Sequence, residues 1–124
     1  MENSKKIIRI IPALLWSGII FFLCFLPGSS FPKEDWLDKI YFDKLVHCFL
    51  YFVLFLLFLR GFLQQNKKAF FIAAGLCIAQ GIFIEIIQGS SLIQHRSFDF
   101  YDIAANIFGV FLAILFKCNV HKTN

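Results

Sequence analysis

Charged residues are scarce in this chain. Only 16% of its 124 residues are Asp, Glu, Lys or Arg, whereas 59% are hydrophobic. A soluble domain of this size needs more polar groups to cover its surface, so the composition excludes an ordinary water-soluble protein. The mean hydropathy of +0.73 and the 18 phenylalanines are typical of a chain whose surface faces lipid.

Several motifs with a known chemistry are also missing. The four cysteines are scattered through or beside apolar runs without a CxxC pair, which argues against a disulfide framework or a zinc site. There is no P-loop, dinucleotide fingerprint or nucleophile-elbow serine, so no cofactor is expected. The first apolar run is followed by Pro27 and Gly28 rather than by a signal-peptidase site, which predicts an uncleaved first helix.

What the sequence does contain is four apolar segments, at residues 10–26, 45–63, 69–88 and 102–117. A helix needs about 20 residues to cross roughly 30 Å of hydrocarbon. The runs are continuous and lack alternation, which favours helices over strands. We therefore predict an all-α, single-domain membrane protein (1–124) with four transmembrane helices. The fourth segment is the shortest, so its polar first turn is expected to enter the membrane.

The connecting segments predict an orientation. Residues 64–68 form a short basic hairpin, whereas residues 27–44 mix aromatic and charged side chains, as expected of an interfacial segment. Most basic residues fall at the termini and the hairpin, which predicts a multi-pass protein of the cell membrane with both termini in the cytoplasm. Because the positive charges follow this topology, membrane lipids are the expected partners and nucleic acid is not. The sequence leaves the oligomeric state open.

This topology places most of the remaining polar residues at one outer mouth. The second segment begins there, the third ends there, and the fourth begins there. The candidate binding residues are Asp43, Lys44, His47, Tyr51, Glu85, Gln88, Arg96, Asp99, Asp102 and Asn106.

Helical spacing sharpens this prediction. Lys44, His47 and Tyr51 share one helix face, and the fourth helix is expected to start near Ser97 as its N-cap. Glu85 continues a stripe of small residues at positions 73, 77 and 81, so it should point into the bundle. An ionised carboxylate there needs a partner, and Lys44, His47 and Arg96 are the candidates. The cluster is either a set of structural ion pairs or a functional site.

The order of these motifs resembles the VanZ-like family, small bacterial membrane proteins named after a teicoplanin-resistance protein. The resemblance covers roughly residues 26–113 and rests on four motifs, D-K-x-x-H-x-x-x-Y, E-x-x-Q, R-x-x-D-x-x-D and D-x-x-x-N-x-x-G, which begin at Asp43, Glu85, Arg96 and Asp102. It implies a role at the cell envelope, including lowered susceptibility to teicoplanin-type glycopeptides, and an envelope lipid or glycopeptide-like molecule as ligand. It implies no particular reaction.

Four kinds of function remain open on the sequence alone. The first is a membrane module that binds an envelope component or an amphipathic small molecule. The second is an enzyme acting on a lipid-linked or cell-wall substrate, with His47, Glu85, Asp99 and Asp102 as candidate catalytic groups. The others are a transporter, for which four helices are few, and a scaffold whose ion pairs only join helices. The same four residues lack the close spacing of known metal motifs, so no metal site is predicted.

Overall fold

The protein is an all-helical bundle in the computed structural model, which describes residues 1–27, 42–62 and 66–123. Its helices are α1 (Glu2–Phe25), α3 (Phe42–Gly61), α4 (Lys67–Gly89) and α5 (Phe100–Lys122). Each is long and apolar enough to cross a membrane. The predicted all-α architecture with four membrane-spanning segments is therefore confirmed.

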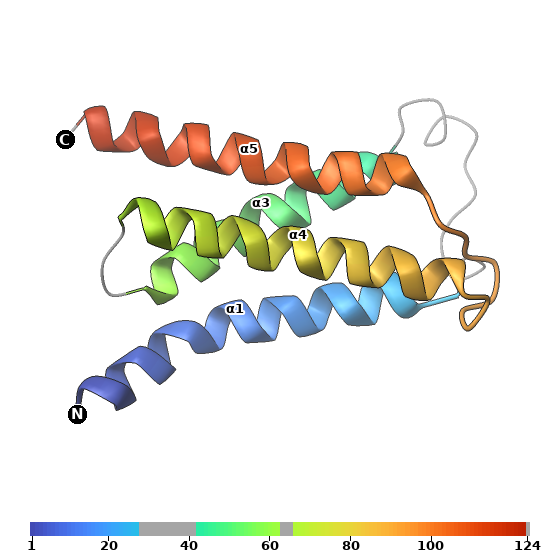
Figure 1. The fold of residues 1–124 in the computed structure, drawn as a ribbon, viewed down its shortest axis with the longest axis horizontal. Coiled ribbons are helices and arrows are strands. Elements are labelled where there is room, and N and C mark those ends of the chain that lie inside the picture. Colours follow the sequence, from blue (N-terminus) through green and yellow to red (C-terminus); the bar gives the residue numbers. More distant parts are fainter. Residues whose placement is uncertain (28–41, 63–65, 124) are drawn as a thin grey trace.

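Consecutive helices of the bundle run in opposite directions, so both termini lie at the same end (Figure 1). α3 is the central helix: it packs against α1, α4 and α5, and its contact with α5 is the most extensive in the described parts of the chain. It also contributes the largest set of buried side chains, including Leu54, Phe55 and Leu59. The bundle is thus organised around the α3–α5 pair.

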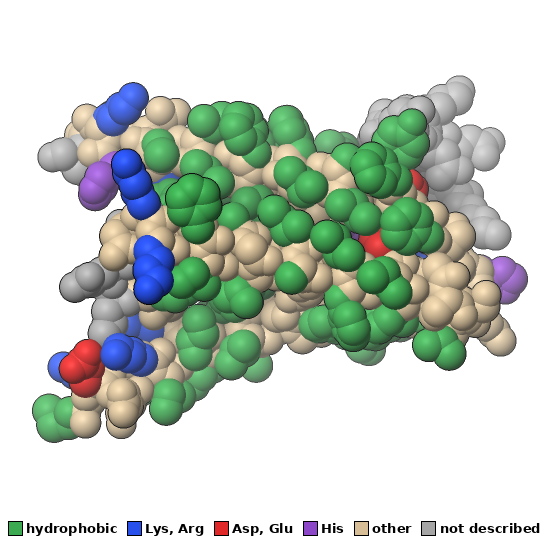
Figure 2. Space-filling view, viewed as in Figure 1, with side chains coloured by type: hydrophobic (Ala, Val, Ile, Leu, Met, Phe, Trp, Pro, Cys, Tyr) green, Lys and Arg blue, Asp and Glu red, His purple; other side chains and the backbone are tan. Residues whose placement is uncertain are grey.

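The outer surface of the bundle is apolar along the middle of the helices (Figure 2). Large hydrophobic side chains such as Phe71 and Phe22 are strongly exposed. In water, such a surface would cause aggregation, but against acyl chains it costs nothing. The exposed phenylalanines therefore follow from the membrane environment that the composition predicts.

Positive charge gathers at the end of the bundle where the termini lie (Figure 2). These residues lie at the start of α1, the end of α3, the start of α4 and the end of α5. They are Lys5, Lys6, Arg9, Arg60, Lys67, Lys68, Lys117 and Lys122. The opposite end holds the start of α3, the end of α4 and the start of α5, where the sequence predicted the polar cluster.

Two helices extend beyond the predicted transmembrane segments. α5 continues through Asn119 to Lys122, past residue 117, and α1 begins at Glu2, before residue 10. Hydropathy marks where a helix meets water, but a helix ends only where a breaker or cap ends it, and neither polar stretch contains one. α5 therefore has 23 residues although its apolar segment is the shortest, and its polar first turn and polar last turn belong to one continuous helix.

The last residues of the predicted interfacial segment are helical. Residues 42–44 form the first turn of α3. The remainder of that segment, residues 28–41, lies outside the described residues. Asp43 and Lys44 are therefore held on a helix, which fixes their position relative to His47.

α3 and α5 approach closely because Gly109 lacks a side chain. A Cβ atom at Gly109 would overlap the Cys48 carbonyl oxygen on α3. Gly109 and Ala113, four residues apart on α5, are both buried. Small residues at helix contacts let membrane helices pack through their backbones. This contact lies two turns from Asp102 and so sets the distance across which the polar residues of the two helices meet.

We expect Gly109→Ala to separate α3 from α5 and to lower the free energy of unfolding by about 1–3 kcal/mol, the usual cost of overpacking. The measurement is denaturant-induced unfolding of the purified protein in detergent, followed by circular dichroism. Gly75→Ala is the matched control, because a Cβ there meets no atom within 4 Å. Equal stability of the two variants would show that the close approach does not limit packing.

Candidate functional site

The Lys44 ammonium lies at the centre of the polar end of the bundle. It is 2.7 Å from an oxygen of Asp43, and 2.5 Å from oxygens of both Asp99 and Asp102. Asp43 belongs to α3, as does Lys44, whereas Asp99 and Asp102 lie at the start of α5. One cation therefore bonds to three carboxylates and joins α3 to α5. The site extends from the surface into the bundle, because Asp43 is exposed and Asp102 is buried.

Asp99 forms the N-cap of α5, in place of the predicted Ser97. Its Oδ1 accepts a hydrogen bond of 2.8 Å from the Tyr101 backbone N–H, while its Oδ2 faces Lys44. Aspartate is among the best N-cap residues because its carboxylate accepts from an unpaired N–H and opposes the positive end of the helix dipole. The Lys44 ammonium beside it lowers the pKa of Asp99 below its ordinary value.

His47 connects α3 to α5 below this ion cluster. Its Nδ1 lies 3.0 Å from Oδ1 of Asn106, and its Nε2 lies 3.6 Å from Oδ2 of Asp102. All three side chains are buried. The 3.0 Å contact is a hydrogen bond, whereas 3.6 Å is too long for one. The imidazole is thus oriented by Asn106, with its second nitrogen directed toward a carboxylate.

Glu85 points inward from α4, as the stripe of small residues predicted. It is 0% exposed, and its Oε2 accepts a hydrogen bond of 2.9 Å from the Asp99 backbone N–H. Its other oxygen, Oε1, has no hydrogen-bond partner among the described residues, and the buried hydroxyl of Tyr51 has none either. Unpaired polar atoms in a buried position are costly, so they indicate a strained or ligand-binding position.

Gln88 and Arg96 connect the cluster to the end of α1. Gln88 Nε2 donates to the Cys24 carbonyl at 2.8 Å, and Arg96 Nε donates to the Leu26 carbonyl at 3.3 Å. These carbonyls belong to the C-terminal end of α1, where the last groups of a helix lack intrahelical partners. Both side chains therefore cap α1. Glu85 accepts its hydrogen bond from the Asp99 backbone N–H. The sequence had suggested Lys44, His47 and Arg96 as its partners.

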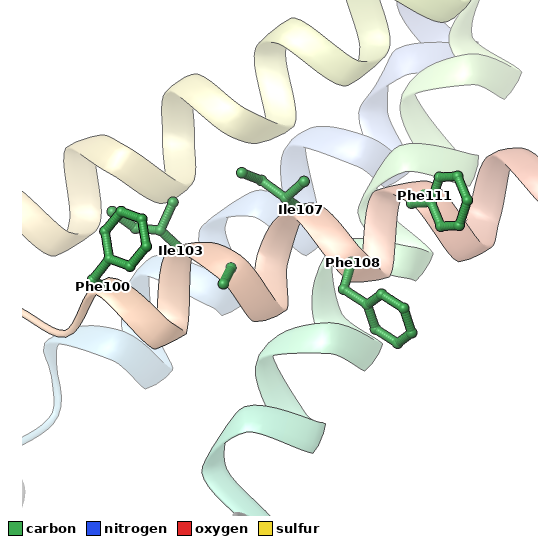
Figure 3. A pocket seen from close by; sticks show the side chains of 6 residues that line it. Phe100, Ile103, Ile107, Phe108 and Phe111 are labelled. Carbon is green, nitrogen blue, oxygen red and sulfur yellow. The ribbon is translucent and has the colours of Figure 1, made fainter.

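A cavity of about 460 Å³ lies elsewhere, on α5. It is lined by Phe100, Ile103, Ala104, Ile107, Phe108 and Phe111 (Figure 3). All are apolar, and Phe100, Phe108 and Phe111 are exposed. Asp102 and Asn106 are buried in the bundle and do not line it. The cavity is therefore a lipid-facing groove, and the polar cluster is a packed set of side chains beside it.

Comparison with known proteins finds one similar chain in fission yeast. The protein is 32% identical over 119 residues to the uncharacterized protein C11E3.10 of Schizosaccharomyces pombe, in an alignment that covers 95% of this chain. The chain spans 66% of the length of that relative. No family model matches the chain. No solved structure shows a significant match to it.

Two overlapping groups in the cluster have the composition of metal ligands. In one, His47, Glu85 and Asp102 each direct a ligand atom to within 4.8 Å of the others. In the second, Asp43, Asp99 and Asp102 do the same. Each group takes its members from two or three helices that meet only in the fold, so no short sequence motif contains all three ligands of either group. The sequence predicted that these residues lie at one mouth of the bundle but not that their ligand atoms come this close together.

Replacing Lys44 with methionine should strongly destabilise the bundle. Removing one member of a buried ion cluster typically costs about 3–5 kcal/mol, and a value near 3 is expected because Lys44 is partly exposed. The free energy of unfolding in detergent measures this. Lys6→Met is the control, since Lys6 forms an exposed ion pair with Glu2 worth about 0–1 kcal/mol. A loss no larger in Lys44→Met than in this control would contradict a central role for Lys44.

The same ion cluster predicts a pH effect at Asp99. Its lowered pKa means that the folded state gains stability above the pKa of the unfolded chain, and this gain is lost as the pH falls through the lower folded pKa. In Lys44→Gln the pKa of Asp99 should rise toward its ordinary value. Carboxyl ¹³C chemical shifts in detergent micelles measure both titrations, with Asp99→Asn to assign the signal. Identical titrations would show that Lys44 is not the cause.

Proposed function

We propose that the chain is a VanZ-like membrane protein of the cell envelope, whose polar cluster binds the polar part of an envelope component or amphipathic small molecule. The observation that carries the proposal is the convergence of residues from all four VanZ-like motifs. Asp43, Lys44, Glu85, Asp99 and Asp102 come from separate parts of the sequence, yet each contacts another member of the cluster. Ionisable residues in membrane segments are costly and are generally retained for function.

The chemistry of the cluster supports recognition of a polar or cationic group. Four carboxylates meet one lysine and one histidine, so negative charge dominates around Lys44. The side chains of Asp43 and Asp99 are 59% and 35% exposed. They form an accessible edge above the buried members. A ligand group with hydrogen-bond donors or positive charge is the natural complement of such an edge.

The groove on α5 supports an amphipathic ligand. It begins at Phe100, the residue after Asp99, and continues along the exposed side of the helix to Phe111. An acyl chain in this groove would lie in the membrane with its headgroup at the level of Asp99. The polar edge and the apolar groove thus match the two halves of a lipid-like molecule.

The distribution of basic residues supports a location for the site. With the basic end in the cytoplasm, the cluster lies at the outer surface of the cell membrane. Envelope precursors and glycopeptide antibiotics are met on that side. Lowered susceptibility to teicoplanin-type glycopeptides is the phenotype that the proposal includes.

A second function, catalysis on a lipid-linked or cell-wall substrate, is favoured by one observation. His47 and Asp102 are adjacent, and the free oxygen of Glu85 belongs to the same cluster. Carboxylates and imidazole are the usual groups for general acid–base chemistry. Binding remains the preferred function, because the polar edge formed by Asp43 and Asp99 is accessible, whereas the catalytic candidates His47, Glu85 and Asp102 are buried.

The test is a teicoplanin-susceptible bacterial host that expresses the full chain or its variants. The wild-type chain should raise the inhibitory concentration of teicoplanin, and Asp102→Asn should return it to the level of the empty host, because Asp102 connects Lys44 to His47. Lipid and cell-wall precursor profiles of the same strains separate binding from catalysis. A precursor that changes only with the wild-type chain would favour the enzyme.

Lys68→Gln is the control, because Lys68 lies in the first turn of α4 at the opposite end of the bundle. It should behave as the wild type. Immunoblots of membrane fractions ensure that the variants are compared at equal abundance. Resistance that persists in Asp102→Asn at normal abundance would refute a role for the cluster, and no effect of the wild-type chain would refute the glycopeptide phenotype.

A further inference from the structure

The two groups of possible metal ligands in the polar cluster share Asp102 but differ in how far Lys44 neutralises their negative charge. In the outer group, the Lys44 ammonium bonds to all three carboxylates, so it occupies the position that a cation would take. The inner group consists of His47, Glu85 and Asp102, which come from three different helices and are all buried. It contains two carboxylates, of which Asp102 bonds to Lys44 through Oδ1, and its own basic group is the His47 imidazole.

The geometry of His47 is that of a metal ligand. When Asn106 Oδ1 accepts the 3.0 Å hydrogen bond, the proton of the neutral imidazole is on Nδ1. Nε2 then carries a lone pair and faces Asp102 Oδ2 at 3.6 Å. The distance is too long for a hydrogen bond, and a cation bound by both atoms would stabilise this contact. Metal-bound histidines typically have this arrangement, with the second ring nitrogen donating to an oxygen that fixes the tautomer.

The unpaired oxygen of Glu85 is a second, independent reason to expect a bound cation. It is fully buried, one of its oxygens is held by the Asp99 N–H, and the other has no hydrogen-bond partner among the described residues. The Tyr51 hydroxyl, also unpaired, lies 3.5 Å from the position of a Cβ on Gly81, one turn before Glu85. A buried carboxylate oxygen without a partner is expensive, and a bound cation would stabilise it.

We infer that His47, Glu85 and Asp102 bind a first-row divalent transition-metal ion, such as Mn²⁺ or Zn²⁺. One imidazole and two carboxylates suit these ions better than Mg²⁺ or Ca²⁺, which prefer oxygen ligands alone. The three ligand atoms lie within 4.8 Å of one another. Atoms on opposite sides of an ion with bonds of about 2.2 Å are about 4.4 Å apart, so small side-chain movements suffice. The inference rests on the proposed function, because it assigns a cation to the same cluster.

The experiment titrates the purified, untagged full chain in detergent with Mn²⁺ and follows free Mn²⁺ by electron paramagnetic resonance. We expect one tightly bound ion per chain, competed by Zn²⁺. Glu85→Gln keeps the shape of the side chain but removes its charge, and it should weaken binding at least about tenfold, as loss of a charged ligand does. Glu2→Gln is the control, because Glu2 is a carboxylate at the other end of the bundle, and it should bind as the wild type does.

A second measurement does not depend on how the variants fold. Pulsed electron paramagnetic resonance of Mn²⁺ bound to the wild-type chain should detect the ¹⁴N nucleus of a coordinated imidazole. His121→Gln, which changes an exposed histidine near the C-terminus, should keep that signal, and His47→Gln should lose it.

The outcomes are distinct. No bound Mn²⁺ in the wild type, no ¹⁴N signal, or equal affinity in Glu85→Gln would overturn the metal site and leave a neutral Glu85 carboxyl as the explanation of its unpaired oxygen. The proposed function would survive that result if Asp102→Asn still abolished resistance. Conversely, Mn²⁺ binding without any susceptibility phenotype would support the metal site and refute the glycopeptide role.

Discussion

A carboxylate at the edge of a membrane needs a cation or hydrogen-bond donors, and at the polar end of this bundle Lys44 meets that need. Its ammonium bonds to Asp43 on its own helix and to Asp99 and Asp102 at the start of α5. The position of α5 depends on this contact, since Asp99 also caps the helix. Glu85 depends on it indirectly, because it accepts from the backbone of Asp99. Three helix ends are thereby joined through one side chain.

Backbone packing deeper in the bundle makes this contact possible. Where Gly109 meets the Cys48 carbonyl, α3 and α5 are so close that a Cβ atom would overlap the carbonyl oxygen. One turn nearer to the polar end, the same proximity brings His47 within 3.0 Å of Asn106. Short polar side chains can bond across two helices only when the backbones are near each other. Apolar packing and polar geometry are therefore parts of a single constraint.

The sequence predicted the elements of this structure better than their ends. Four helices, an inward Glu85 and the meeting of α3, α4 and α5 at one mouth followed from hydropathy and helical spacing. The N-cap of α5 did not follow from the sequence, because Ser97 and Asp99 are both good N-cap residues and only the contact with Lys44 distinguishes them. Nor did the caps on α1 made by Gln88 and Arg96, since they depend on where the end of a distant helix lies. Spacing reveals which face a residue occupies but not which neighbour it will meet.

The separation of charge along the bundle has an electrical consequence. Eight lysines and arginines lie at the end with the termini, where positive charge gathers (Figure 2). At the other end the carboxylates of Asp43, Asp99, Asp102 and Glu85 outnumber the described cations, Lys44 and Arg96. The protein is therefore a dipole aligned with the membrane normal. Each elementary charge moved across the full potential is worth about 2.3 kcal/mol per 100 mV. A membrane potential with a negative interior therefore favours insertion with the basic end inside over the reverse orientation.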